Sequence, residues 1–335
     1  MKSLIQRLVE TSGPSGYESQ VRALVRAEVE PHADQVRVDA MGNLIVVKGQ
    51  ANLNGRKLML SAHMDEIGLI ATHVDEQGFV RFTPLGGVHR LNLAGSRVRF
   101  LNGAPGVIGA EQLEDATRLP TFEQLFVDVG ATSRGDCPVR VGDTAVFERP
   151  FLDLGQRLAA KAMDDRIGVA ILIETLKQLH ETPNQVFFVF SVQEEVGLRG
   201  ATTAAYGLDP DIGIAVDVTR SGDTPRGVKM DVQLGKGPAI KVRDSGMLSD
   251  PRIVDWMVRT AEKAGLPYQL EVLEAGTTDA RAIQLSRAGV PAGCVSIPCR
   301  YIHAPSEMVD RDDVENAVRL LLALVQQADP FHETE

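Results

Sequence analysis

The stretch from Gln185 to Gly200, with the sequence QVFFVFSVQEEVGLRG, constrains the fold more than any other part of the chain. Residues 186–190 are consecutive apolar residues, either β-branched or aromatic. Such a run predicts a strand buried on both faces, as in the middle of a parallel sheet. Glu194 and Glu195 follow directly, and ligands of open α/β sheets bind just beyond the carboxyl ends of the strands. Two acids at such an edge are paired, metal-bound or catalytic, unless they simply face solvent in a loop.

Helices and strands alternate along most of the chain, which favours an α/β fold with a mostly parallel central sheet flanked by helices. Buried strands are expected at 57–61, 186–192, 211–218, 239–242, 268–272 and 292–297. Helices are expected at 2–10, 17–30, 167–179, 251–264, 279–287 and after Asp310.

Residues 68–157 depart from this alternation. They contain six short segments of alternating hydrophobicity separated by Gly or Pro, and no convincing amphipathic helix. This spacing predicts a small all-β sandwich or barrel. We therefore expect residues 1–67 and 158–335 to form an α/β domain, with 68–157 inserted as an all-β domain.

Composition excludes several classes of protein. The formal net charge of −10 gives little electrostatic support for nucleic-acid binding. The three cysteines lack C-x-x-C spacing, which argues against a disulfide framework and fits a reducing compartment. The N-terminal segment does not resemble a signal peptide, and no apolar run approaches the roughly 20 residues that span a bilayer. We expect a cytoplasmic protein with no membrane partner.

Acids and histidines gather just past the predicted strands and at helix starts. Imidazoles and carboxylates without thiolates are a suitable ligand set for divalent metals. Two neighbouring metals need a bridging carboxylate, and a remaining acid can act as a base on water. The candidates are His63, Asp65, Asp164, Asp165, Glu194, Glu195, Asp217, Asp279 and His303.

The motifs around these candidates occur together in a known order. They are AHMDE at His63, AMDDR at Asp164, VQEEVGLRG at Glu194, AVDVT at Asp217, GTTDA at Asp279 and RYIH at His303. The chain thereby resembles, nearly from end to end, the tetrahedral (TET) dinuclear metallo-aminopeptidases. That family includes glutamyl, leucyl and lysyl aminopeptidases and proteins formerly labelled endoglucanases.

The resemblance implies a phosphorylase/hydrolase-like metallopeptidase core that binds two divalent ions per subunit, Zn²⁺ or Co²⁺. It also implies a cis peptide between Asp164 and Asp165, a β-insert used for dimer contacts, and a twelve-subunit tetrahedral homo-oligomer. His63, Asp164 and Glu195 would hold one metal; Asp164, Asp217 and His303 would hold the other, with Asp164 bridging.

Roles for the remaining residues follow from the same resemblance. Glu194 would be the general base that takes a proton from the bridging water and returns it to the leaving amine of a short peptide. Asp65 would orient the imidazole of His63. Asp165 would cap the helix that begins near it. The residues themselves give three candidates for binding substrate, which are Thr278, Asp279 and His89. Asp279 lies at a helix start and could equally be a cap, and His89 lies in a loop after Gly86 and Gly87 that could reach the site.

Other functions remain open at this level. A deacylase or carboxypeptidase could use the same metal chemistry, given a cationic residue for the substrate carboxylate. A glycosidase could use Glu194 and Glu195 as its two carboxylates. A non-catalytic scaffold would lack a ligand or Glu194, and neither is missing. Arg220, Arg243 and Arg300 lie near site segments and could favour an acidic N-terminal residue.

Overall fold

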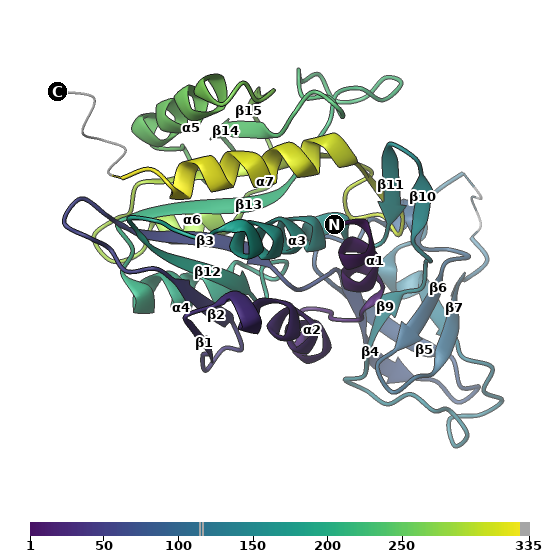
Figure 1. Ribbon diagram of the computed structural model, residues 1–335. Helices are drawn as coiled ribbons and strands as arrows, with labels where there is room; N and C mark the ends of the chain where they lie inside the picture. Colours follow the sequence, from purple (N-terminus) through teal and green to yellow (C-terminus); the bar gives the residue numbers. More distant parts are fainter. Residues whose placement is uncertain (114, 116, 329–335) are drawn as a thin grey trace.

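The computed structural model describes residues 1–113, 115 and 117–328. It contains a large mixed sheet with helices on both faces and a small closed β-barrel at one end (Figure 1). The predicted α/β class with an all-β insertion is confirmed at this level. No helix of the described residues is long and apolar enough to cross a bilayer.

The large sheet has eleven strands, and the main path runs β1-β2-β12-β3-β13-β16-β17-β11-β10. Strand β14 pairs with β16 and β15, off this path. The strands are β1 (Gln35–Val38), β2 (Leu44–Lys48), β3 (Lys57–His63), β10 (Leu152–Leu154), β11 (Arg157–Ala160), β12 (Gln185–Ser191), β13 (Ile212–Arg220), β14 (Ala239–Arg243), β15 (Gln269–Val272), β16 (Ala292–Arg300) and β17 (Glu307–Asp310).

The centre of this sheet is parallel, and β14 and β15 form a second parallel pair off the main path. Strands β12, β3, β13 and β16 are neighbours and run in the same direction. The strands on either side, β2 and β17, pair antiparallel with this centre. The predicted mostly parallel sheet is thus a mixed sheet, because hairpins and short return strands extend the parallel centre on both edges.

Helices cover both faces of the sheet. α1, α2, α3, α5 and α7 share one apolar core with the sheet, whereas α4 and α6 pack on the opposite face in a second cluster (Figure 1). The helices are α1 (Lys2–Glu10), α2 (Ser19–Val29), α3 (Met163–Gln178), α4 (Arg199–Leu208), α5 (Pro251–Lys263), α6 (Asp279–Gln284) and α7 (Arg311–Val325), with short 3₁₀ turns at Glu30–His32, Arg90–Asn92 and Phe122–Gln124.

The barrel closes in the order β4-β5-β8-β7-β6-β9, and its first and last strands pair with each other. All six segments expected there form strands: β4 (Gly68–Val74), β5 (Val80–Leu85), β6 (Arg97–Phe100), β7 (Pro105–Ala110), β8 (Leu125–Asp128) and β9 (Thr144–Phe147). Apolar side chains of these strands form their own core.

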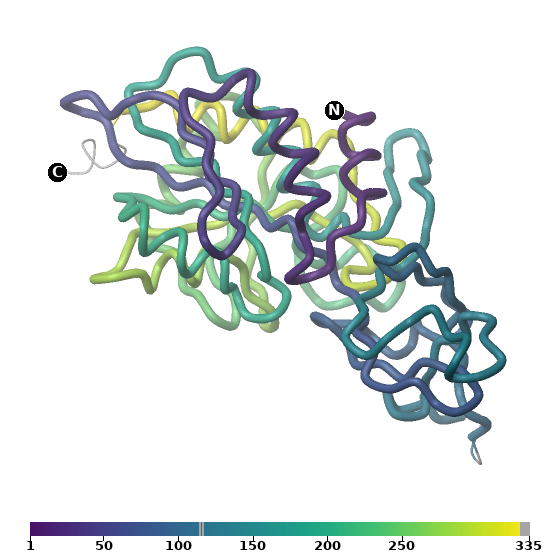
Figure 2. Tube along the Cα trace, turned by 90° about the horizontal axis from the view of Figure 1, so that it is seen from below, coloured from purple at the N-terminus to yellow at the C-terminus, as the bar shows by residue number. Residues whose placement is uncertain are grey.

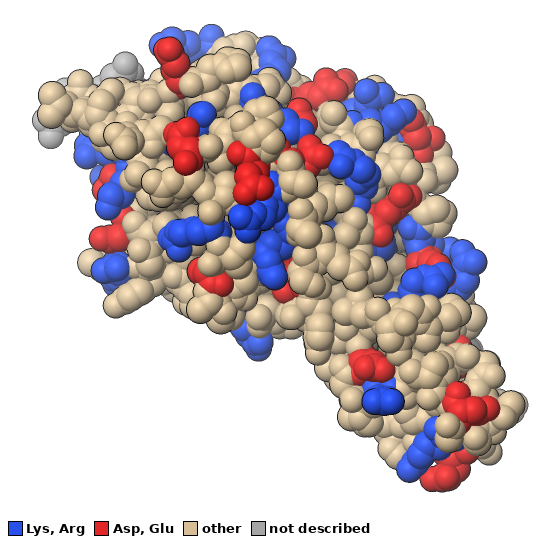
Figure 3. All heavy atoms as spheres, turned by 60° about the horizontal axis from the view of Figure 1, so that its bottom comes forward, with Lys and Arg blue, Asp and Glu red and all other residues tan. Residues whose placement is uncertain are grey.

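In space the barrel is a separate lobe. It projects from the larger body in Figure 2, and Figure 3 shows charges of both signs interspersed over the face that is turned forward. Strands β10 and β11 return to the large sheet through pairing with β17. The chain therefore leaves the sheet at the end of β3 and re-enters it just before α3.

Candidate active site

The four parallel strands bring predicted site residues to one edge of the sheet. His63 is the last residue of β3, and its register partner on β12 is Ser191. Glu194 and Glu195 follow shortly after β12, and Asp217 lies on β13, beside β3. The carboxyl ends of parallel strands meet at the same edge of a sheet. His63 and Asp217 therefore become neighbours although they are 154 residues apart in sequence.

Asp164 occupies the centre of this arrangement. It lies at the kinked start of α3, and its two carboxylate oxygens face different imidazoles. Oδ1 is 3.0 Å from Nε2 of His63, and Oδ2 is 3.2 Å from Nε2 of His303. The peptide between Asp164 and Asp165 is cis, as predicted. One carboxylate between two imidazoles is the arrangement that a bridging ligand requires.

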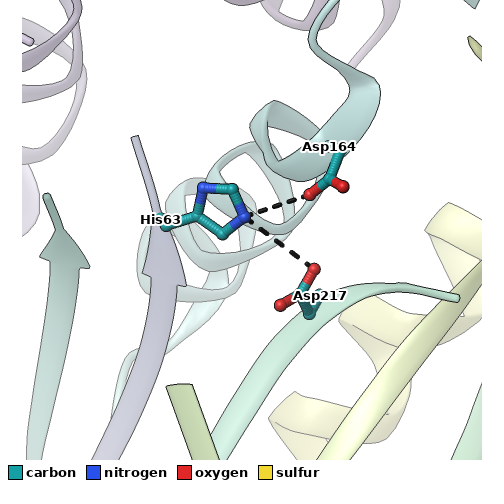
Figure 4. A group of neighbouring side chains, drawn as sticks. All are labelled: His63, Asp164 and Asp217. Carbon is teal, nitrogen blue, oxygen red and sulfur yellow. Dashed lines mark hydrogen bonds and ion pairs between the residues drawn. The ribbon is translucent and has the colours of Figure 1, made fainter. Parts of the chain in front are cut away.

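Each imidazole has a further carboxylate nearby. Nε2 of His63 is 4.0 Å from Oδ1 of Asp217, and Figure 4 shows the carboxylates of Asp164 and Asp217 both facing this ring nitrogen. Nε2 of His303 is 3.3 Å from Oε1 of Glu195. The two groups His63–Asp164–Asp217 and Asp164–Glu195–His303 each have ligand atoms within 4.8 Å of one another.

These groups correct the division expected from the sequence. The resemblance implies Glu195 in the group of His63 and Asp217 in that of His303, whereas the structure places Asp217 with His63 and Glu195 with His303. The sheet order explains the exchange, since β13 lies directly beside β3 and brings Asp217 to His63. Glu195 lies beyond the strand end and reaches His303 instead.

The ligand set fits divalent cations. It offers imidazole nitrogens and carboxylate oxygens without a thiolate, a combination suited to zinc and to cobalt. Oε1 of Glu195 is buried and accepts no hydrogen bond from any described residue, although the imidazole of His303 lies close by. A buried carboxylate oxygen without a hydrogen bond is costly in a folded protein, and a cation would satisfy it.

Asp65 links the His63 imidazole to the loop that carries the acids. Nδ1 of His63 lies 3.1 Å from the carbonyl oxygen of Asp65 and 3.5 Å from its Oδ1. The buried Asp65 carboxylate also accepts the N–H groups of Glu194 at 3.0 Å and Glu195 at 3.2 Å, and the hydroxyl of Ser15 at 2.6 Å. Asp65 therefore holds His63 and both glutamates in one network, a wider contact than the expected orientation of the ring alone.

Two further acids hold the backbone of this centre. Asp165 accepts the N–H of Gly168 in the first turn of α3, as its expected capping role requires, and also that of His63. Glu307 accepts the N–H groups of Asp164 and His303. Glu307 was not predicted as a site residue, because an acid four residues after His303 has no pattern that distinguishes it from a loop residue.

Burial and charge shift the pKa values of the site in opposite directions. Burial raises the pKa of Glu194 against the opposing effect of His63, and the negative charges of Asp217 and Glu195 act in the same direction as burial. Burial and the charge of Asp164 raise the pKa of Asp217. Burial disfavours a charged His63, but the negative charge of Glu194 and the contact with Asp164 raise its pKa all the same. Excess negative charge at the edge thus favours a cation.

A cavity of about 920 Å³ opens next to these acids. Its lining includes the candidate site residues His63, Asp164, Glu194, Glu195, Asp217 and His303. Residues of α4, α6, the end of β13 and the segment 273–278 also line it. The barrel also reaches it through Gly87, after β5. A Cβ atom on Gly87 would lie only 2.5 Å from Nδ1 of His303, so this approach requires glycine.

The three expected substrate residues have different positions. Thr278 lines the cavity and caps α6 by accepting the N–H of Ala280. Asp279 is buried behind it and accepts the hydroxyls of Ser61 and Ser191. His89 instead lines a neighbouring cavity between the barrel and the segment after β16, so the structure does not bring it to the acids.

Of the three arginines considered for specificity, one lines the cavity. Arg220, at the end of β13, is exposed there, and its side chain has no ion pair or hydrogen bond with the described residues. Arg300 forms a two-point contact with Asp223, at 3.0 and 2.7 Å. Arg243 is exposed and is not among the residues that line the cavity.

Comparison with known proteins decides among the functions left open. The M42 glutamyl aminopeptidase family matches residues 42–320. The chain belongs to this family. The lysyl aminopeptidase of Pyrococcus furiosus is 36% identical over 99% of this chain and 98% of its own. The chain is an aminopeptidase, and the prediction of a hydrolase that acts as an exopeptidase is confirmed.

Solved structures agree with this assignment of the M42 enzyme. Aminopeptidase APDkam598 from the archaeon Desulfurococcus kamchatkensis has a TM-score of 0.94 at 42% identity, covering 98% of this chain and 95% of its own. The TET1 peptidase of Pyrococcus horikoshii, which can assemble into a tetrahedron or a large octahedral shell, has a TM-score of 0.89 at 34% identity and covers 97% and 99%.

Proposed function

We propose that this M42 enzyme releases N-terminal residues from short peptides with two divalent cations, Zn²⁺ or Co²⁺. His63, Asp164 and Asp217 would hold one of them, and Asp164, Glu195 and His303 the other. Cations bound there would act as Lewis acids toward the scissile carbonyl and lower the pKa of water. The observation that carries the proposal is the Asp164 carboxylate, whose two oxygens face His63 and His303 separately.

Glu194 is proposed as the general base. Its Oε2 lies 3.9 Å from Nε2 of His63, so its carboxylate borders the candidate metal ligands. It also lines the cavity in which a peptide would bind. Burial raises the pKa of Glu194, which favours uptake of a proton from the attacking water and its return to the leaving amine.

Asp65 supports this step by holding the backbone that carries the base. It fixes the backbone of Glu194 through one carboxylate oxygen and that of Glu195 through the other. The base and the neighbouring candidate ligand therefore keep their relative positions when substrate binds. Such supporting contacts orient ligands and tune their basicity.

A panel of aminoacyl-p-nitroanilides tests this function. The enzyme would be assayed as purified, after removal of metals with a chelator, and after addition of Zn²⁺ or Co²⁺. We expect hydrolysis that requires both metal and a free α-amine, and that Glu194→Gln abolishes without loss of bound metal. Hydrolysis of N-blocked compounds only would favour a deacylase. Inactivity toward every compound with metal bound would refute the proposal.

We further propose that residues 68–157 form a dimerisation domain within a twelve-subunit assembly. The assembly of the Pyrococcus horikoshii relative supports this proposal. Exposed apolar side chains on the barrel lobe, among them Leu91, Val107 and Val141, would find partners in a dimer. Light scattering coupled to size-exclusion chromatography measures the assembly directly; a monomer at micromolar concentration would contradict the proposal. A cytoplasmic location stays a prediction.

A further inference from the structure

Glu307 connects the backbones of two candidate ligands that lie far apart in the sequence. Its side chain is buried, at 1% exposure. Oε1 accepts the N–H of His303 at 2.7 Å, and Oε2 accepts that of Asp164 at 3.0 Å. One carboxylate therefore joins residues on either side of the candidate Asp164–Glu195–His303 group.

The backbone of Glu307 is itself held in place. It is the first residue of β17, which pairs with β11 on one side and with β16 on the other. Strand β11 leads to Asp164, and β16 leads to His303. Glu307 thus lies between the two chain segments whose ligands it contacts.

His303 needs such a fixed partner. It has a φ angle of +62°, in the left-handed region that non-glycine residues rarely adopt, and the segment before it contains Tyr301 at +64°. These backbone angles persist only where surrounding contacts enforce them. The hydrogen bond from the His303 N–H to Glu307 is one such contact.

We propose that Glu307 is a positioning residue that sets the separation of Asp164 and His303. The inference rests on the proposed function. Loss of this carboxylate weakens cation binding at the Asp164–Glu195–His303 group more than at the group that contains His63. Supporting contacts of this kind typically change metal affinity or activity by about 10–100-fold.

The substitution Glu307→Gln tests the proposal with little change in shape. The amide keeps one oxygen acceptor but presents an NH₂ group to the second backbone N–H, so one of the two hydrogen bonds is lost. Asp313→Asn is a matched control, because Asp313 is a buried carboxylate that accepts two backbone N–H groups, those of Gly235 and Gly237, at 2.7 Å each. Asp313 is not among the residues that line the cavity.

Metal-stripped proteins would be titrated with Zn²⁺ in a calorimeter, and their Co²⁺ forms compared by visible absorption. For Glu307→Gln we expect about 10–100-fold weaker binding of one of two ions and altered cobalt bands, while Asp313→Asn binds both ions as the wild type does. Equal zinc affinities and identical cobalt spectra in all three proteins would overturn the proposal, even if both variants unfold at lower temperature.

The two proposals fail in different ways. If the wild type binds no metal, the proposed function itself fails. If the wild type binds two ions and Glu307→Gln binds them equally well, only the role of Glu307 fails. Should Glu307→Gln not fold, Glu307→Asp serves in its place: it keeps the charge but shortens the side chain, and the same selective loss of one ion is expected.

Discussion

Replacing Asp65 with asparagine tests how the active-site loop is held. The carboxylate accepts the N–H groups of Glu194 and Glu195 through different oxygens, and the Ser15 hydroxyl donates to the second of these. An asparagine keeps one oxygen and turns its NH₂ group toward a backbone donor. At least one of these partly buried N–H groups therefore loses its acceptor.

The magnitude follows from these contacts. A buried donor without a partner costs about 1–3 kcal/mol, and a hydrogen bond to a charged acceptor contributes about 1.5–3 kcal/mol. We therefore expect Asp65→Asn to lower the free energy of unfolding by about 2–4 kcal/mol. Because the loop carries Glu194, kcat/KM should fall about 10–100-fold as well. Ser15→Ala removes only the hydroxyl that donates to the Asp65 carboxylate and should cost about 1.5–2 kcal/mol with little effect on activity.

Urea unfolding monitored by circular dichroism gives the stabilities, and hydrolysis of the best p-nitroanilide gives the activities. The order wild type, Ser15→Ala, Asp65→Asn should hold for stability, with a large loss of activity only in the last. If Asp65→Asn matches the wild type in both stability and activity, the hydrogen bonds of Asp65 neither stabilise the fold nor position Glu194, and the prediction is refuted.

Further predictions concern pH, the barrel loop and specificity. Burial raises the pKa of Asp313 from 3.8 to about 6. Because this pKa is raised, the folded protein takes up a proton at Asp313 as pH falls through 6, while the unfolded chain does so only near pH 4. The free energy of unfolding of the wild type, relative to that of Asp313→Asn, should therefore rise by about 1 kcal/mol from pH 7 to pH 5. Urea unfolding measures both proteins, and a difference that does not change with pH would contradict this. Gly87→Ala places a Cβ 2.5 Å from the His303 ring and should reduce kcat/KM, whereas Gly207→Ala, on α4 with open space around it, should not. Arg220→Ala should lower kcat/KM for a glutamyl substrate about 10-fold relative to a leucyl one, because a charged hydrogen bond from the guanidinium to the glutamyl carboxylate is lost. An equal fall in kcat/KM for both substrates would exclude a role of Arg220 in specificity.

Much of the fold follows from patterns that act locally. The six barrel strands were predicted because alternation and turn residues specify each of them without reference to the rest of the chain. The central strands were predicted because their apolar runs suit a position buried on both faces, most clearly the β-branched and aromatic run of β12. The antiparallel edges were not predicted, since pairing direction depends on which strands meet rather than on the residues in each.

The same distinction applies to the site. The types of residue at His63, Asp164 and His303, together with their motifs, predicted a metal centre. The division of Glu195 and Asp217 between two groups could not be read from the sequence, because it depends on β13 lying beside β3. His89 was misplaced for a similar reason: its loop lies near the site, but the ring lines a different cavity.

The barrel also has a consequence for folding. It separates His63 from Asp164 by 101 residues, and closing a flexible loop of that length costs roughly 4 kcal/mol of chain entropy beyond a constant term. Because β4 pairs with β9, a folded barrel holds the two ends of this insertion together. The folded insertion therefore lowers the entropy cost of closing the loop between His63 and Asp164. An unstructured linker of equal length would leave that cost in full.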